Sequence, residues 1–139
     1  MNIAVESAPG IRTAEARSKE GTAFGCPRNA FTNHFVYTVI SPRARGLSVG
    51  VNLTPDKHCN FDCVYCEVDR RTPVTWNELD LDILSSELEA ALALIHSGKL
   101  REDPLYALAP TDLLRLRHVA VSGEGEPTLC PRFREALET

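Results

Sequence analysis

The sequence predicts an α/β fold in which parallel strands alternate with helices. Residues 47–53 alternate between large and small side chains, and residues 117–122 form a short segment bounded by a glycine-rich turn, so both are predicted to be strands. Between them, residues 79–97 carry apolar side chains at intervals of three and four, which is typical of a helix that packs on a sheet. A helix between two strands is the pattern of a parallel strand–helix–strand unit. In such units, functional residues follow the carboxyl ends of the strands.

The segments on either side of this unit complete the predicted organisation. Residues 1–34 have no sustained apolar period and are predicted to be a flexible leader and N-terminal extension. Residues 35–139 are predicted to form the core domain, beginning with an additional strand over 35–40. Within the strand over 47–53, Gly50 predicts a close approach of another backbone.

Both predicted helices have residues that favour the start or the end of a helix. Asn77 or Asp80 can cap the helix over 79–97, and Gly98 suits its end. A second helix is predicted over 131–138, with a proline in its first turn and Thr128 as a nearby cap.

Size, composition and charge fit a single cytoplasmic domain. The chain has 139 residues, of which 43% are hydrophobic and 24% charged, and these values are ordinary for one soluble domain. It has neither a long apolar run nor a signal-peptide pattern, which predicts no membrane association. The net charge of −4 gives no overall footprint for nucleic acid. RNA is not excluded as a substrate, since small basic clusters that could contact phosphates occur at Arg43/Arg45, Arg70/Arg71 and Arg115/Arg117.

Three of the five cysteines form a compact motif, Cys59-x3-Cys63-x2-Cys66, directly after the strand over 47–53. Thiolates at this spacing indicate a soft metal, either iron–sulfur or zinc. Because no second cysteine pair follows, the fourth ligand position is left open, as in catalytic metal sites. The alternative is a noncatalytic zinc or redox module in which His58 or Cys26 supplies the fourth ligand. No role is assigned to Cys26 or Cys130.

The cysteine motif, with Tyr65 directly before its last cysteine, resembles the signature of the radical S-adenosylmethionine (radical SAM) enzymes. The resemblance implies that Cys59, Cys63 and Cys66 hold a 4Fe-4S cluster and that the remaining iron binds S-adenosylmethionine. An electron donor such as flavodoxin or ferredoxin would drive reductive cleavage to a 5′-deoxyadenosyl radical. Tyr65 is then expected near the adenine.

A second motif, Ser122-Gly123-Glu124-Gly125-Glu126-Pro127-Thr128, follows the strand over 117–122. Radical SAM enzymes carry a Gly-Gly-Glu-like motif at this place, which binds the methionyl amino group. Gly125, Glu126 and Pro127 match its end, whereas Glu124 replaces the first glycine. The resemblance therefore implies a cofactor-binding loop of Gly123, Gly125, Glu126 and Pro127, with Glu126 receiving the amine.

The same region resembles an uncharacterised branch of radical SAM proteins with a Gly-Glu-Pro-Thr motif. This branch is distantly similar to wyosine-type tRNA-modifying enzymes. The resemblance implies a partial (β/α) TIM-like barrel, for which six strand–helix units need on the order of 180 residues. The chain is therefore expected to hold the incomplete N-terminal part of such a barrel, and an inactive fragment is a further alternative. The substrate is not predicted.

Overall fold

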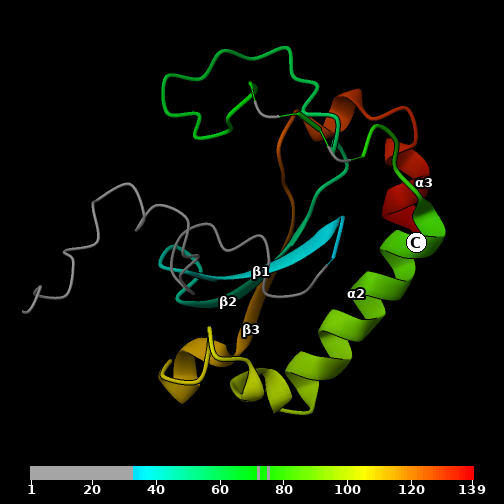
Figure 1. The fold of residues 1–139 in the computed structure, drawn as a ribbon. Helices are drawn as coiled ribbons and strands as arrows, with labels where there is room; N and C mark the ends of the chain where they lie inside the picture. The colour runs from blue at the N-terminus through cyan, green and yellow to red at the C-terminus, as the bar shows by residue number, and fades with distance from the viewer. Residues whose placement is uncertain (1–32, 72, 75) are drawn as a thin grey trace, which may run out of the picture.

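The chain folds around a three-stranded mixed sheet in the computed structural model, which describes residues 33–71, 73–74 and 76–139 (Figure 1). The strands β1 (Val36–Ser41), β2 (Gly46–Val51) and β3 (Leu116–Val121) lie in the order β1-β2-β3. β1 and β2 form an antiparallel hairpin, and β3 pairs parallel to β2. Residues 1–32, which include Cys26 and most of the predicted leader, lie outside the described residues.

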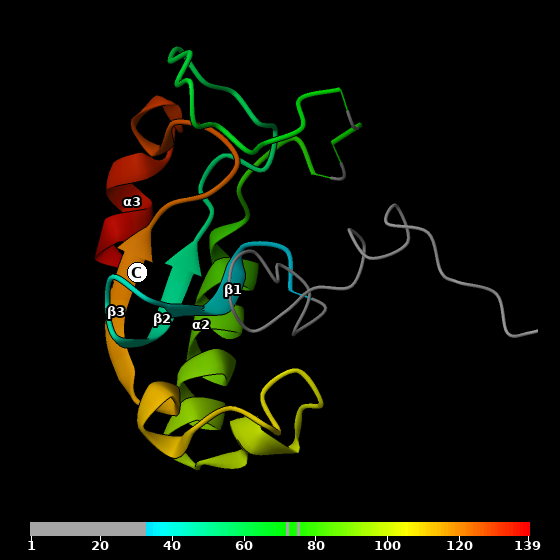
Figure 2. The ribbon, with the colours of Figure 1, turned by 90° about the vertical axis from the view of Figure 1, so that its left-hand side faces the viewer.

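The helix α2 (Leu81–His96) connects the two parallel strands and lies along one face of the sheet (Figures 1 and 2). Its Leu84 and Ala91 pack into a core with side chains of β1 and β2. Asp80 caps the helix, because its side chain accepts hydrogen bonds from the backbone N–H groups of Asp82 and Ile83. Gly98 follows its end at φ 74°, a left-handed conformation that glycine adopts readily. The predicted helix is confirmed, with Asp80 as its cap.

A buried carboxylate on α2 fixes the start of β1. Glu87 Oε1 accepts a hydrogen bond from the His34 N–H at 2.7 Å. Its Oε2 accepts from the N–H groups of Phe35 at 2.8 Å and Val36 at 3.1 Å. Backbone donors at the beginning of the strand are thereby satisfied in the interior, and α2 is attached to the sheet by more than apolar contact.

A second core lies at the opposite end of the sheet from the cysteine motif. Its centre is Tyr106, which is fully buried with Ile40, Leu47 and Leu100. The Tyr106 hydroxyl donates to the Thr38 carbonyl oxygen at 2.9 Å and lies 2.7 Å from Thr38 Oγ1. The segment between α2 and β3, which includes 3₁₀ helices at Lys99–Glu102 and Thr111–Leu114, is thereby attached to β1.

Two details differ from the sequence expectations. Gly50 is approached by the side chain of Tyr37, whose ring occupies the place that a Cβ atom would need, rather than by another backbone. The last helix, α3, begins at Phe133 and spans Phe133–Glu138. Thr128 does not cap it, because its N–H and hydroxyl both donate to Glu126.

The described residues contain one parallel strand–helix–strand unit, formed by β2, α2 and β3. The partial barrel implied by the resemblance stays a prediction. Among the described helices, none combines the length and apolarity needed to cross a bilayer.

Replacing Glu87 is expected to destabilise the fold, because buried backbone N–H groups would lose their acceptor. Glu87→Ala should lower the free energy of unfolding by about 3 kcal/mol, and Glu87→Gln, which keeps one acceptor oxygen, by less. Urea denaturation followed by circular dichroism measures the difference. Glu89→Ala, on the exposed side of α2, is the matched control. Equal effects at the two positions would contradict the role given to Glu87.

Tyr106 is expected to make stability fall at alkaline pH. Burial raises the pKa of Tyr106 above its ordinary value of 10.0, although the Thr38 hydrogen bond opposes the shift. The folded state therefore holds the phenolic proton more tightly than the unfolded chain. This contribution is complete below the unfolded pKa and is lost as the pH rises above it. Urea midpoints measured from pH 8 to 11 should decline less steeply for Tyr106→Phe, and parallel declines would contradict the assignment.

Candidate functional site

The three motif cysteines lie in one exposed loop that follows β2, the loop drawn in green beyond the end of the sheet in Figure 1. Cys59, Cys63 and Cys66 are all free thiols, and none is buried. A turn joins the last two, since the Cys66 N–H donates to the Cys63 carbonyl oxygen at 3.0 Å. The structure therefore presents these three predicted ligands at the carboxyl end of a parallel strand.

The base of this cysteine loop is ordered by short-range hydrogen bonds. Asn52, buried at the end of β2, accepts a hydrogen bond from the Thr54 N–H through Oδ1. The Lys57 N–H donates to the Thr54 carbonyl oxygen, and Lys57 has a left-handed φ of 61°. The His58 N–H donates to Asp56 Oδ1 at 3.1 Å. These turns reverse the chain immediately before Cys59.

The second motif lies against this base. The Ser122 N–H, just after β3, donates to the Val51 carbonyl oxygen at 2.9 Å. The Glu124 N–H donates to Asn52 Oδ1 at 3.3 Å, so that one side-chain oxygen accepts hydrogen bonds from both loops. The Glu126 N–H donates to the His58 carbonyl oxygen at 2.9 Å. Glu126 is thereby hydrogen-bonded to the residue that precedes the first motif cysteine.

The two glycines of the second motif permit this contact between loops. A Cβ atom at Gly123 would overlap the side chain of Asn52. One at Gly125 would overlap the His58 carbonyl oxygen and lie 2.8 Å from Thr54 Oγ1. Both glycines are therefore required for packing between the two loops, whereas the sequence predicts that they let the backbone approach a ligand.

The Glu126 carboxylate and the Thr54 hydroxyl lie near this junction. Glu126 Oε1 accepts from the Thr128 hydroxyl at 2.6 Å and from its N–H at 3.2 Å, which caps the 3₁₀ helix Pro127–Leu129. Thr54 Oγ1 is buried and has no hydrogen-bond partner within the described part of the chain. A buried hydroxyl without a partner is costly. This hydroxyl lies beside Gly125, at the contact between the two loops.

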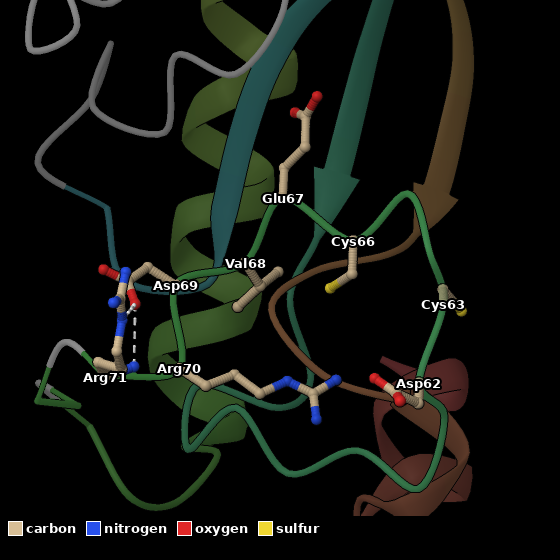
Figure 3. A pocket seen from close by; sticks show the side chains of 8 residues that line it. All are labelled: Asp62, Cys63, Cys66, Glu67, Val68, Asp69, Arg70 and Arg71. Atoms are coloured by element: carbon tan, nitrogen blue, oxygen red, sulfur yellow. Dashed lines mark hydrogen bonds and ion pairs between the residues drawn. The ribbon is translucent and has the colours of Figure 1, made fainter.

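A basic side chain crosses the cysteine loop (Figure 3). Arg70 Nη2 donates to the Phe61 carbonyl oxygen at 3.2 Å. Desolvation lowers the pKa of Arg70, but hydrogen bonding and charge interactions with the thiol groups of Cys66 and Cys59 outweigh it and raise the pKa overall. In Figure 3 the Cys66 sulfur points toward this side chain, whereas that of Cys63 points away.

Tyr65 projects from the same loop and is 81% exposed. Its hydrogen bond with Cys63, followed by the negative charge of that thiolate, raises the pKa of Tyr65. The cysteine loop borders a cavity of about 540 Å³ that Cys63 and Cys66 line together with Asp62 and residues 67–71. An exposed aromatic side chain beside this cavity is free to cover a planar ligand.

The donor chemistry suits a soft metal, but the thiols are not gathered around one point. Within the described residues, no group of three His, Cys, Asp or Glu side chains is close enough to hold a metal ion. Three free thiols on one exposed loop are the right ligand type for iron–sulfur or zinc. The Cys63 side chain would have to turn inward for all three sulfurs to bind together (Figure 3).

The two remaining cysteines, Cys26 and Cys130, lie outside the cysteine motif in the sequence. Cys130 is buried in the core with Leu79 and Leu84, and it acts as an apolar packing residue. Cys26 lies outside the described residues.

Comparison with known proteins finds distant relatives only. The chain is similar to a UPF0026 protein of Helicobacter pylori (strain J99 / ATCC 700824), with 29% identity over 107 residues. It is 28% identical to the UPF0026 protein of strain ATCC 700392 / 26695 over the same length. Each alignment covers 75% of this chain and 29% of the relative, so the chain spans less than a third of the length of these proteins. No family model and no solved structure matches the chain.

Sequence reasoning missed the residues that assemble the site. The sequence pattern places Asn52 only within a strand, although a polar residue at a strand end followed by a turn is a recognisable sign of a side chain that binds backbone N–H groups. No local sequence pattern indicates the contacts of Thr54 or Arg70, and Arg70 stands out only as a member of a basic pair. Their contacts depend on which segments meet in three dimensions.

Removing the shared acceptor should loosen both loops. Asn52→Ala is expected to lower the free energy of unfolding by about 1–3 kcal/mol, because the buried Thr54 N–H and the partly buried Glu124 N–H lose their acceptor. Hydrogen exchange should accelerate at the amides of Thr54 and Glu124. Asn60→Ala, on the exposed part of the cysteine loop, is the control. Unchanged exchange at Glu124 would contradict the bridging role of Asn52.

Proposed function

We propose that this chain forms the cluster-binding part of a radical SAM protein. Cys59, Cys63 and Cys66 are the three thiolate ligands of a 4Fe-4S cluster, and Glu126 receives the amino group of S-adenosylmethionine. The observation that carries the proposal is the hydrogen bond between the Glu126 N–H and the His58 carbonyl oxygen. This hydrogen bond brings the second motif beside the first. A single molecule that binds both the metal and the Glu126 carboxylate requires the two motifs to be this close.

The bound cluster would supply one-electron reduction of the sulfonium, which releases a 5′-deoxyadenosyl radical. The residues of the chain bind and orient. The two loops leave the adjacent parallel strands β2 and β3 at the same edge, so a small molecule can contact both. Glu126 offers a carboxylate to an ammonium group, and the Thr54 hydroxyl offers a further polar contact.

Tyr65 and the loop cavity complete the proposed cofactor site. We assign the exposed ring of Tyr65 to packing on the adenine, and Gly123, Gly125 and Pro127 to the loop that holds the cofactor. Reduction requires a one-electron donor, for which a flavodoxin or a ferredoxin is suitable. We place the reaction in the cytoplasm, where thiols stay reduced. Because the relatives are more than three times as long as the matched segment, activity on a substrate is proposed for a whole protein of that length.

Anaerobic reconstitution with iron and sulfide tests the proposal. The chain should turn brown, with the broad visible absorption of an iron–sulfur cluster, and Cys63→Ala should lose most of the bound iron. Cys130→Ala is the matched control, since this cysteine lies in the core and should leave iron binding unchanged. Iron and sulfide analysis gives the measurement.

Two outcomes would count against the proposal. A wild-type chain that stays colourless but binds one zinc ion tightly indicates the noncatalytic module. A chain that holds a cluster yet neither binds S-adenosylmethionine nor forms 5′-deoxyadenosine after reduction rejects the assigned cofactor.

A further inference from the structure

The Arg70 side chain is held in place by the loop that it crosses. Its Nη2 donates to the Phe61 carbonyl oxygen at 3.2 Å, which joins two positions nine residues apart. The preceding residue is fixed as well, because Lys57 Nζ donates to the Asp69 carbonyl oxygen at 3.0 Å. The backbone around Arg70 is thus attached to the base of the cysteine loop, and its side chain to the tip.

The direction of the Arg70 side chain determines how close its positive charge lies to the cysteine sulfur atoms. The Cys66 sulfur points toward the Arg70 side chain on the inner side of the loop (Figure 3), and the charge of this sulfur is among the causes that raise the pKa of Arg70. Its neighbour Arg71 behaves differently. Arg71 Nε pairs with Asp69 Oδ1 at 3.2 Å, and its side chain is 94% exposed. Two adjacent arginines of the same charge therefore differ in direction: Arg70 lies on the side of the Cys66 sulfur, whereas Arg71 pairs with Asp69 (Figure 3).

The charge of Arg70 is fixed across the accessible pH range, because arginine does not deprotonate in proteins. Three thiolates and an added electron concentrate negative charge in this loop. A permanent cation near the sulfur atoms lowers the free energy of the more negative, reduced form. The reduction potential of a bound cluster rises accordingly.

We propose that Arg70 is a positioning residue of the sulfur site, which ties the cysteine loop together and holds a permanent positive charge beside the Cys66 sulfur so that a bound cluster is reduced more easily. The redox part of this inference rests on the proposed function. The tie across the loop does not, since it is a property of the metal-free chain.

The tie is tested by limited proteolysis of the metal-free protein. Chymotrypsin cleaves after aromatic residues, and both Phe61 and Tyr65 are exposed in the loop. Cleavage there should be several-fold faster in Arg70→Gln than in wild type, and unchanged in Arg71→Gln. Matched urea midpoints for both variants establish that the fold is intact. Equal cleavage rates for the two variants would overturn the tie.

The effect on the cluster is tested by redox titration of the reconstituted protein, followed by electron paramagnetic resonance. At a fixed potential, Arg70→Gln should lower the ratio of reduced to oxidised cluster at least tenfold, a shift of 59 mV for one electron. Arg70→Lys, which keeps the charge but not the planar set of donors, should recover part of the loss. Arg71→Gln should titrate close to wild type.

The possible results separate the two proposals. If wild type holds a cluster and Arg70→Gln titrates as wild type does, the redox role of Arg70 is wrong while the proposed function stands. If wild type holds no cluster, the proposed function and the redox role both fail, and proteolysis alone decides whether Arg70 ties the loop.

Discussion

The site depends on one side-chain oxygen at the end of β2. Asn52 Oδ1 accepts hydrogen bonds from the Thr54 N–H in one loop and the Glu124 N–H in the other. Because parallel strands end at the same edge of a sheet, the two loops leave it side by side, but nothing in the strand pairing itself holds them in contact. A buried acceptor shared by both loops does so, and the hydrogen bond from Glu126 to His58 extends the contact toward the cysteines.

The rest of the described fold supports this edge. α2 covers the opposite face of β2 from Tyr37, and Glu87 fixes β1 through three backbone donors. Tyr37 crosses Gly50, and its hydroxyl lies 2.9 Å from Ser122 Oγ, at the point where β3 passes into the second loop. The strands that carry the two loops are therefore held on both faces, whereas the cysteine loop itself extends into solvent with Tyr65 exposed. A supported strand end with an open loop is the arrangement that the proposed cofactor site requires.

Much of the local structure follows from short-range patterns. The leucine spacing, with Asn77 or Asp80 as the cap, predicts α2, and the strand patterns predict all three strands within one or two residues, because these signals act over a few residues of chain. The cysteine spacing likewise identified the candidate ligands. The partner of Gly50 was predicted wrongly as a backbone, since the Tyr37 ring comes from a strand whose register the sequence does not reveal.

The sequence by itself determined the residue types of the site: three thiols at metal-binding spacing after one strand, and a glycine-rich acidic loop after the next. Only the tertiary structure decided how they meet. Asn52 and Glu124, like Glu126 and His58, are far apart in the chain, and their contact depends on the parallel pairing of β2 and β3. The same holds for Arg70. The Cys66 sulfur points toward its side chain (Figure 3), which a hydrogen bond to the Phe61 carbonyl oxygen holds in place. Residue type is a local property, whereas the direction of a side chain is fixed by the atoms that surround it.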